Sequence, residues 1–289
     1  MTGTFSWNLL ADLREMWSLP FMLNAFRAGT IVAVPAALVG WFMVLRRQSF
    51  AGHTLAMVGF PGAAAAVWLG IGATVGYLAF GVLAALLFAL LPAGRGGGDE
   101  SSAVGTVQAL ALASGMLFVA LYKGFLNGTS ALLFGSFLGI TSRQVVLLGV
   151  VAAVALTVLA LVGRPLLFAS VDGDVARAHG VPVRSLGGVF LVLLGVTAAE
   201  VGQITGALLV FALLVLPPAT VQVLTTRPAR GLAASVLLAV VTVWVALFAA
   251  YYSPYPLGFW LTTIAFGGFV LAYAGRAVVD RIGRLAVAP

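Results

Sequence analysis

Long apolar runs separated by short polar breaks dominate the chain. A helix needs about 20 consecutive apolar residues to cross the hydrocarbon core of a bilayer. Runs of roughly that length lie at 24–45, 54–70, 75–94, 103–122, 144–163, 185–201, 204–224, 231–252 and 259–275. The pattern predicts eight or nine transmembrane helices. The region 185–224 is the least regular, because Glu200, Gly202 and Gln203 interrupt it.

The breaks between these runs are short and have recognisable turn chemistry. They comprise Arg46-Arg47, the Gly-rich stretch GRGGGDESS (94–102), and the turns KGFLNGTS (123–130) and SPYP (253–256). The Gly-rich stretch is typical of a flexible linker. The segment ALLFGSFLGI (131–140) is too short to span a bilayer, so we expect a re-entrant or interfacial helix there.

Composition places the chain in a membrane. Hydrophobic residues make up 62% of the 289 positions and charged residues only 8%, whereas soluble domains carry about 25% charged residues. Continuous apolar runs favour helices over a β-barrel, whose strands alternate apolar and polar residues. The fold class expected is therefore an all-α polytopic membrane protein. The absence of cysteine excludes disulfides and thiolate metal sites.

The net charge of +7 is explained by membrane orientation rather than by nucleic-acid binding. If the first run crosses from outside to inside, eleven arginines fall inside: Arg46, Arg47, Arg95, Arg164, Arg177, Arg184, Arg227, Arg230, Arg276, Arg281 and Arg284. Four basic residues fall outside: Arg14, Arg27, Lys123 and Arg143. Cytoplasmic loops of membrane proteins carry the excess of Lys and Arg, so the C-terminus and the 164–184 loop are expected in the cytoplasm.

Three regions are expected along the chain. Residues 1–23 lack the pattern of a cleavable signal peptide and are typical of an amphipathic interfacial segment, anchored by Trp7 and Trp17. Residues 24–276 form the transmembrane domain. Residues 277–289 form a cytoplasmic C-terminal tail.

The longest polar interruption, at 164–186, predicts a short helix. Asp172 and Asp174 stand at its start, where negative charge suits the helix dipole. Arg177 and His179 stand near its end, and Gly180 can close it in a left-handed cap before Pro182. Two interpretations fit a short capped helix on a loop: a docking element for a partner, or a solvated connector.

Several stretches in order resemble the permeases of the zinc/manganese/iron ABC importer family. The loop RPLLFASVDGDVARAHGVPV resembles its pattern "RP-L-ASFDPE-ARA-GLPV". GALLVFALLVLPPAT (206–220), VLRRQSFAGHTLAMVGFPGAAAA (44–66) and LLFGSFLGIT (132–141) are similar to further family segments. The likeness runs from about residue 24 to 275.

The resemblance implies a type II-like importer permease in the bacterial inner (cytoplasmic) membrane. It implies a homodimer with the translocation path between the copies, a cytoplasmic ABC ATPase dimer that binds ATP, and an extracytoplasmic metal-binding protein. Residues 172–180 would be the coupling helix that docks on the ATPase. No permanently bound cofactor is implied, and the transported metal would be zinc first, then manganese or iron.

Ionisable groups within spans are costly and are functional candidates. His53 and Met57 are four residues apart and share one helix face, and an imidazole with a thioether suits a soft or borderline metal. In the resembling family the matching positions are usually Asp and His, proposed metal ligands, so losing the carboxylate here favours zinc over manganese. The alternatives are a packed histidine and a core methionine.

Glu200 is the second ionisable group within a span. It could supply the carboxylate missing beside His53, cap the next helix, or contact a docked binding protein. Ser136 stands where the family usually has Asp, and His179 is expected to be an exposed helix-end residue.

The chain lacks the G-x-x-x-x-G-K-[ST] phosphate loop and any set of residues for acid–base catalysis. We therefore expect a transport subunit that is not an enzyme and takes its energy from a partner. The rival interpretations are a permease for a metal chelate such as a siderophore, an ion-coupled secondary carrier, and an intramembrane enzyme.

Overall fold

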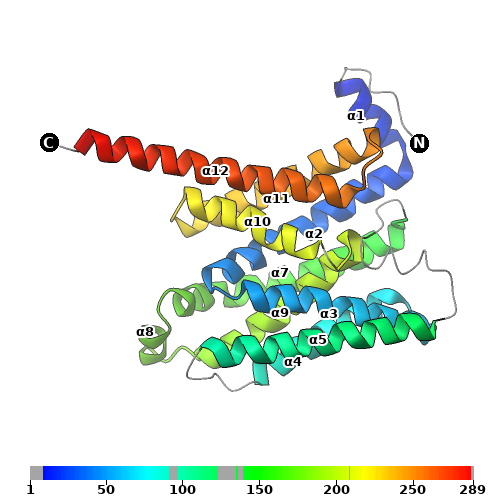
Figure 1. Cartoon of the computed structure of the whole chain (residues 1–289), viewed down its shortest axis with the longest axis horizontal. Coiled ribbons are helices and arrows are strands. Elements are labelled where there is room, and N and C mark those ends of the chain that lie inside the picture. The colour runs from blue at the N-terminus through cyan, green and yellow to red at the C-terminus, as the bar shows by residue number, and fades with distance from the viewer. Residues whose placement is uncertain (1–8, 91–96, 123–134, 136–138, 208, 288–289) are drawn as a thin grey trace.

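The computed structural model describes residues 9–90, 97–122, 135, 139–207 and 209–287, and this part of the chain consists of helices joined by turns, without strands (Figure 1). Its helices are α1 (Leu9–Ser18), α2 (Pro20–Leu45), α3 (Ser49–Trp68), α4 (Ala73–Leu90), α5 (Gly97–Leu121), α7 (Ser142–Val171), α8 (Gly173–Ala178), α9 (Val183–Thr205), α10 (Val210–Leu224), α11 (Pro228–Tyr252) and α12 (Leu257–Val287). Most of the predicted re-entrant segment (131–140), including Ser136, lies outside the described residues.

Eight of the described helices are long and apolar enough to cross a membrane, namely α2, α3, α4, α7, α9, α11, α12 and the part of α5 from Ser102. The ninth apolar helix, α10, has 15 residues, fewer than a spanning helix needs. The prediction of eight or nine spans is confirmed. The region 185–224, which is the least regular in sequence, forms a long helix, α9, followed by the short helix α10.

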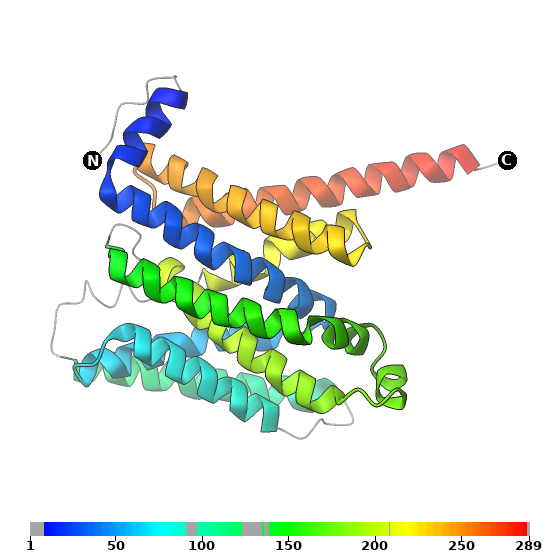
Figure 2. The same ribbon diagram turned by 180° about the vertical axis from the view of Figure 1, so that it is seen from behind.

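The long helices lie side by side in one bundle, with α1 at one end and α8 at the opposite end (Figures 1 and 2). Two helices are the most enclosed: α2, which contacts α7, α9, α10 and α11, and α3, which contacts α4, α5 and α9. Candidate residues on α3 therefore lie within the bundle and not on its perimeter.

Glycine permits the closest helix approaches in the bundle. Gly62 on α3 and Gly76 on α4 face each other so closely that a Cβ on Gly76 would stand 2.0 Å from the Gly62 carbonyl oxygen. Gly81 on α4 and Gly195 on α9 make a second contact of this kind. Small residues at helix contacts are a general feature of membrane bundles, because they let backbones pack together.

Replacing Gly76 with valine is expected to destabilise the bundle strongly. The added side chain would meet backbone atoms, which cannot move aside as a side chain end can, and overpacking of this kind costs about 1–3 kcal/mol or more. Gly105→Val on α5 is the matched control, because nothing lies within 4 Å of a Cβ there. Thermal unfolding in detergent measures the difference, and equal melting temperatures for the two variants would contradict the close contact.

The structure departs from the sequence prediction at two boundaries. α9 continues through Glu200, Gly202 and Gln203 and ends only at Gly206, whose φ is 79°. The polar side chains do not break the helix, because Gln203 donates to the carbonyl oxygen of Ala199 within the same helix. The stretch 97–102, predicted as flexible linker, is the first part of α5. Its Asp-Glu-Ser-Ser sequence suits the first turns of a helix.

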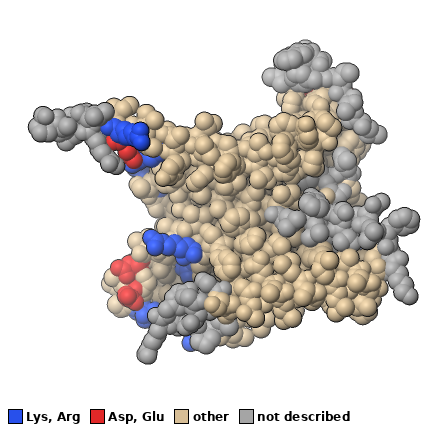
Figure 3. Space-filling view, viewed as in Figure 1, with Lys and Arg blue, Asp and Glu red and all other residues tan. Residues whose placement is uncertain are grey.

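On one face of the molecule, the visible charged side chains gather at one end (Figure 3). On the face shown in Figure 3, Lys, Arg, Asp and Glu lie around α8 and the far part of α12, and the surface between the two ends is uncharged. This separation is what a bundle crossing a bilayer requires, because a charged side chain in the hydrocarbon core is costly.

Candidate functional site

His53 lies in the first turns of α3 and faces α10. Its ring stands 5.2 Å from the ring of Phe211, in an edge-to-face arrangement. The histidine is half-buried, and its Nδ1 is buried without a hydrogen-bond partner among the described residues. Buried polar atoms normally have a partner, so this nitrogen is available to bind a cation or a proton.

Met57 lies one turn further along α3 and is 7% exposed. Its spacing from His53 places both residues on the same helix face. Pro61 follows four residues later within α3. Proline has no N–H to donate to the carbonyl four residues before it, so the Met57 carbonyl lacks its usual helical partner. One turn of α3 therefore offers an imidazole, a thioether and a backbone oxygen.

Contacts with α2 hold α10 in its place opposite His53. A Cβ on Gly40 of α2 would stand 2.0 Å from the Leu214 carbonyl oxygen, which Pro218 leaves without its usual donor. The Gln222 side chain donates to the Trp41 carbonyl at 2.8 Å. α10 is thus fixed against α2 at two levels, with Phe211 near its N-terminus.

Sequence reasoning missed the polar pair beside His53. Thr54 is fully buried and donates from Oγ1 to Oε1 of Gln108 on α5 at 3.1 Å. Gln108 stands within an apolar run of the sequence, and that polar interruption was the available signal. Phe211 carried no signal, because an aromatic residue in an apolar helix is ordinary.

Glu200 is fully buried on α9, and both carboxylate oxygens lack a hydrogen-bond partner among the described residues. Two of its three predicted roles are wrong. A residue with 0% exposure cannot contact a docked protein, and the N-terminus of α10 has no side-chain cap hydrogen bond. An unpaired buried carboxylate is expensive, so a role with a bound cation or proton remains.

No group of three or more His, Asp or Glu side chains that could hold a metal ion occurs in the described part of the chain. His53 and Glu200 are therefore not members of a dense, permanently loaded ligand set there. A sparse set of ligands suits an ion that passes through, because conduction requires a site weak enough to release it.

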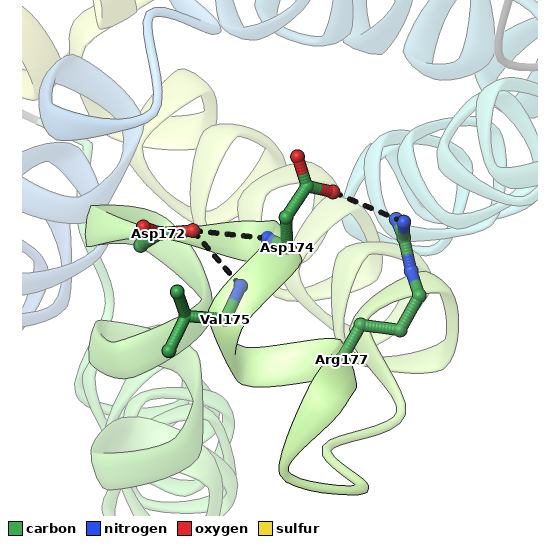
Figure 4. A network of polar contacts seen from close by, with 4 residues as sticks. All are labelled: Asp172, Asp174, Val175 and Arg177. Carbon is green, nitrogen blue, oxygen red and sulfur yellow. Dashed lines mark hydrogen bonds and ion pairs between the residues drawn. The ribbon is translucent and has the colours of Figure 1, made fainter.

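The predicted capped helix is α8, at the charged end of the bundle (Figure 4). The Asp172 carboxylate accepts hydrogen bonds from the backbone N–H groups of Asp174 and Val175 at 3.1 and 3.0 Å, which is an N-cap. Gly180 has a φ of 80°, and the N–H of Val181 donates to the Ala176 carbonyl oxygen. The predicted left-handed cap at Gly180 is confirmed, and Asp172, at the predicted start, is the N-cap of a helix that spans Gly173–Ala178.

One side of α8 packs on the bundle and the other is free. Ala176 is fully buried, whereas Asp174 and Arg177 form an ion pair at 3.1 Å with both side chains largely exposed. His179 is exposed, as expected, and its ring lies 5.9 Å from that of Phe168 on α7. α8 therefore packs on the bundle through one side and presents a charged outer face on the other.

Arg46 connects the end of α7, just before α8, to the turn before α3. Its guanidinium donates to Ser170 near the end of α7 and to Gln48, each at 3.1 Å, and lies 5.3 Å above the Phe190 ring of α9. Burial lowers the pKa of Arg46, yet a guanidinium stays charged in proteins. Sequence reasoning used this residue to end the first apolar run, to orient the chain and within a family-like stretch, but did not predict these contacts.

Eight long apolar helices packed in one bundle define a multi-pass helical membrane protein among the described residues. The sequence profile of the ABC 3 transport family matches residues 18–276. The chain belongs to that family, which confirms the resemblance drawn from the motifs and the fold class expected with it.

Named relatives and a solved structure agree with this family assignment. The chain is 28% identical to the manganese transport system membrane protein MntC of Halalkalibacterium halodurans, over 76% of this chain and 75% of that one. It is 29% identical to the chelated iron transport system membrane protein YfeC of Yersinia pestis, over 86% and 82%. Its fold matches that of PsaBC from Streptococcus pneumoniae in complex with Fab, with a TM-score of 0.82, 24% identity, and coverage of 92% of this chain and 95% of that one.

Proposed function

We propose that this chain is the permease subunit of an ATP-driven importer for a divalent transition-metal ion, with His53 and Met57 as ligands along the translocation path. The observation that carries the proposal is the buried, unpartnered Nδ1 of His53 opposite α10. Family membership and the metal-transporting relatives support it.

The donor atoms favour zinc. Imidazole and thioether ligands suit zinc or copper better than manganese, which prefers carboxylate and carbonyl oxygens. The named relatives carry manganese and chelated iron, and in the family pattern the His53 position is usually Asp. We therefore propose zinc as the leading substrate, with manganese or iron next, because this chain departs from the pattern at the ligand itself.

Energy would come from outside the chain. We propose that two copies form the path, that an extracytoplasmic binding protein delivers the metal, and that a cytoplasmic ABC ATPase docks on the exposed face of α8. Arg46 would pass the movement of α8 to α3, since it contacts the end of α7, the ring of Phe190 on α9 and the turn before α3.

The test is metal uptake by the assembled importer in vesicles. Zinc uptake is expected to need ATP, to exceed manganese and iron(II) uptake, and to fall when a chelator removes free metal. Preferred uptake of a chelate complex would assign the chain to the metal-chelate rival. Uptake by the purified chain alone, without any ATPase, would overturn the proposal in favour of a secondary carrier.

Glu200→Gln is expected to raise the metal concentration needed for half-maximal uptake several-fold without loss of assembly. The amide keeps the size of the side chain and removes the negative charge that would attract a cation, while Glu200→Asp keeps the charge and is the matched control. Uptake kinetics measure the effect. If the Gln variant takes up metal like the unmodified protein, Glu200 is a neutral buried acid and the proposed role fails.

A further inference from the structure

A groove of about 700 Å³ opens between α2, α7 and α11. These three helices lie next to one another on the face seen in Figure 2. His53, Met57 and Glu200 do not line the groove. Its walls are apolar and include Phe42 of α2 and Leu156 and Leu167 of α7.

The groove runs along the helices. The α7 positions that line it, Leu156, Leu159, Ala160, Gly163, Arg164 and Leu167, recur at spacings of three and four, which is one face of a helix. Eleven residues of helix rise by about 17 Å, close to half the roughly 30 Å hydrocarbon core of a bilayer. A channel of this length, direction and polarity matches one acyl chain of one leaflet.

One end of the groove is positively charged. Among the described residues that line the groove, Arg164 is the one with a charged side chain. This side chain is exposed and has no hydrogen bond or ion pair within the described structure. Arg164 lies seven residues before the end of α7, about 10 Å, so its long side chain can reach the headgroup level. Pro228, where α11 begins, lines the same groove, and Arg227 next to it is exposed.

We propose that this groove is a binding site for an anionic phospholipid of the leaflet at the α8 end. The acyl chain lies along α7, and the guanidinium of Arg164 binds the phosphate. An anionic lipid is favoured because a cation without a protein partner, which can reach the headgroup level, lies beside an apolar channel of acyl-chain length. Anionic lipids attract basic residues at this level. A second copy of the chain would have to bury Arg164 without any acidic partner in the groove lining.

The experiment compares phosphatidylglycerol with phosphatidylcholine on the purified full-length chain, by native mass spectrometry from detergent. Arg164→Gln is expected to lower phosphatidylglycerol affinity roughly tenfold, about the effect of one charge-assisted contact. Phosphatidylcholine affinity should fall much less, because the choline cation offsets the charge of its phosphate. Gly163→Trp fills the groove and is expected to weaken both lipids. It should fold, because nothing lies within 4 Å of a Cβ at Gly163.

The controls place the same changes on α12. Gly275→Trp also meets nothing within 4 Å, and Arg281→Gln removes an equal charge from an exposed position; neither should alter lipid binding. Unchanged phosphatidylglycerol affinity in Arg164→Gln would overturn the proposal. A shift from dimer to monomer in Gly163→Trp alone would also overturn it, because a second copy would then cover the groove.

Discussion

His53→Ala is expected to lower metal uptake by at least an order of magnitude while the permease still assembles. The change removes the ring nitrogen that lacks a protein partner. Loss of a metal ligand is costly, because mutating even a residue that only supports a ligand lowers metal affinity or activity 10–100-fold. Little stability is lost with it, since the edge contact with Phe211 contributes about 0.5–1.5 kcal/mol. Uptake of zinc into vesicles that contain the assembled importer measures the effect.

Two matched variants separate a ligand from a packed side chain. Phe211→Leu removes the aromatic contact and keeps the imidazole, so it should reduce uptake far less than His53→Ala. His53→Asp restores the residue usual in the family and should shift preference from zinc toward manganese, because carboxylate oxygens suit manganese. Normal zinc uptake by His53→Ala would show that the imidazole is not on the path.

The parts of the fold that local sequence determines were predictable. Each long apolar run became a helix, because a backbone in lipid must satisfy its own hydrogen bonds. α8 was also predictable, because its caps depend on residues only two to five positions apart. An example is the Asp172 carboxylate, which accepts from the N–H groups of Asp174 and Val175.

The parts that depend on contacts between distant segments were not predictable. Phe211 lies against His53 although 158 positions separate them, and the contact depends on how Gly40 seats α10 against α2. Arg46 meets Ser170 across 124 positions. A single sequence offers no signal for such pairs, and the burial of Glu200, which decides between its possible roles, is likewise a property of the packed bundle.

Reversing charge at Asp172 and Asp174 together, each to lysine, is expected to abolish ATP-driven uptake while metal binding persists. Asp172 accepts both N-terminal hydrogen bonds of α8, and an N-cap contributes about 1 kcal/mol. A helix of six residues is unstable by itself, so it cannot absorb that loss together with two positive charges at the positive end of its dipole. ATP hydrolysis by the assembled importer, measured with and without metal-loaded binding protein, reports the coupling directly.

Variants at other positions test whether the loss of coupling is specific to α8 or follows from any reversal of charge. Asp280→Lys makes the same reversal on α12, where Asp280 pairs with Arg276 at 3.2 Å and is well exposed, and it should leave coupling intact. Gly180→Val keeps every charge but forces a branched residue into a φ of 80°, a conformation that L residues with a β-branch avoid, so it should uncouple uptake as the double reversal does. If both α8 variants hydrolyse ATP in step with metal uptake, the helix is a connector and the ATPase docks elsewhere.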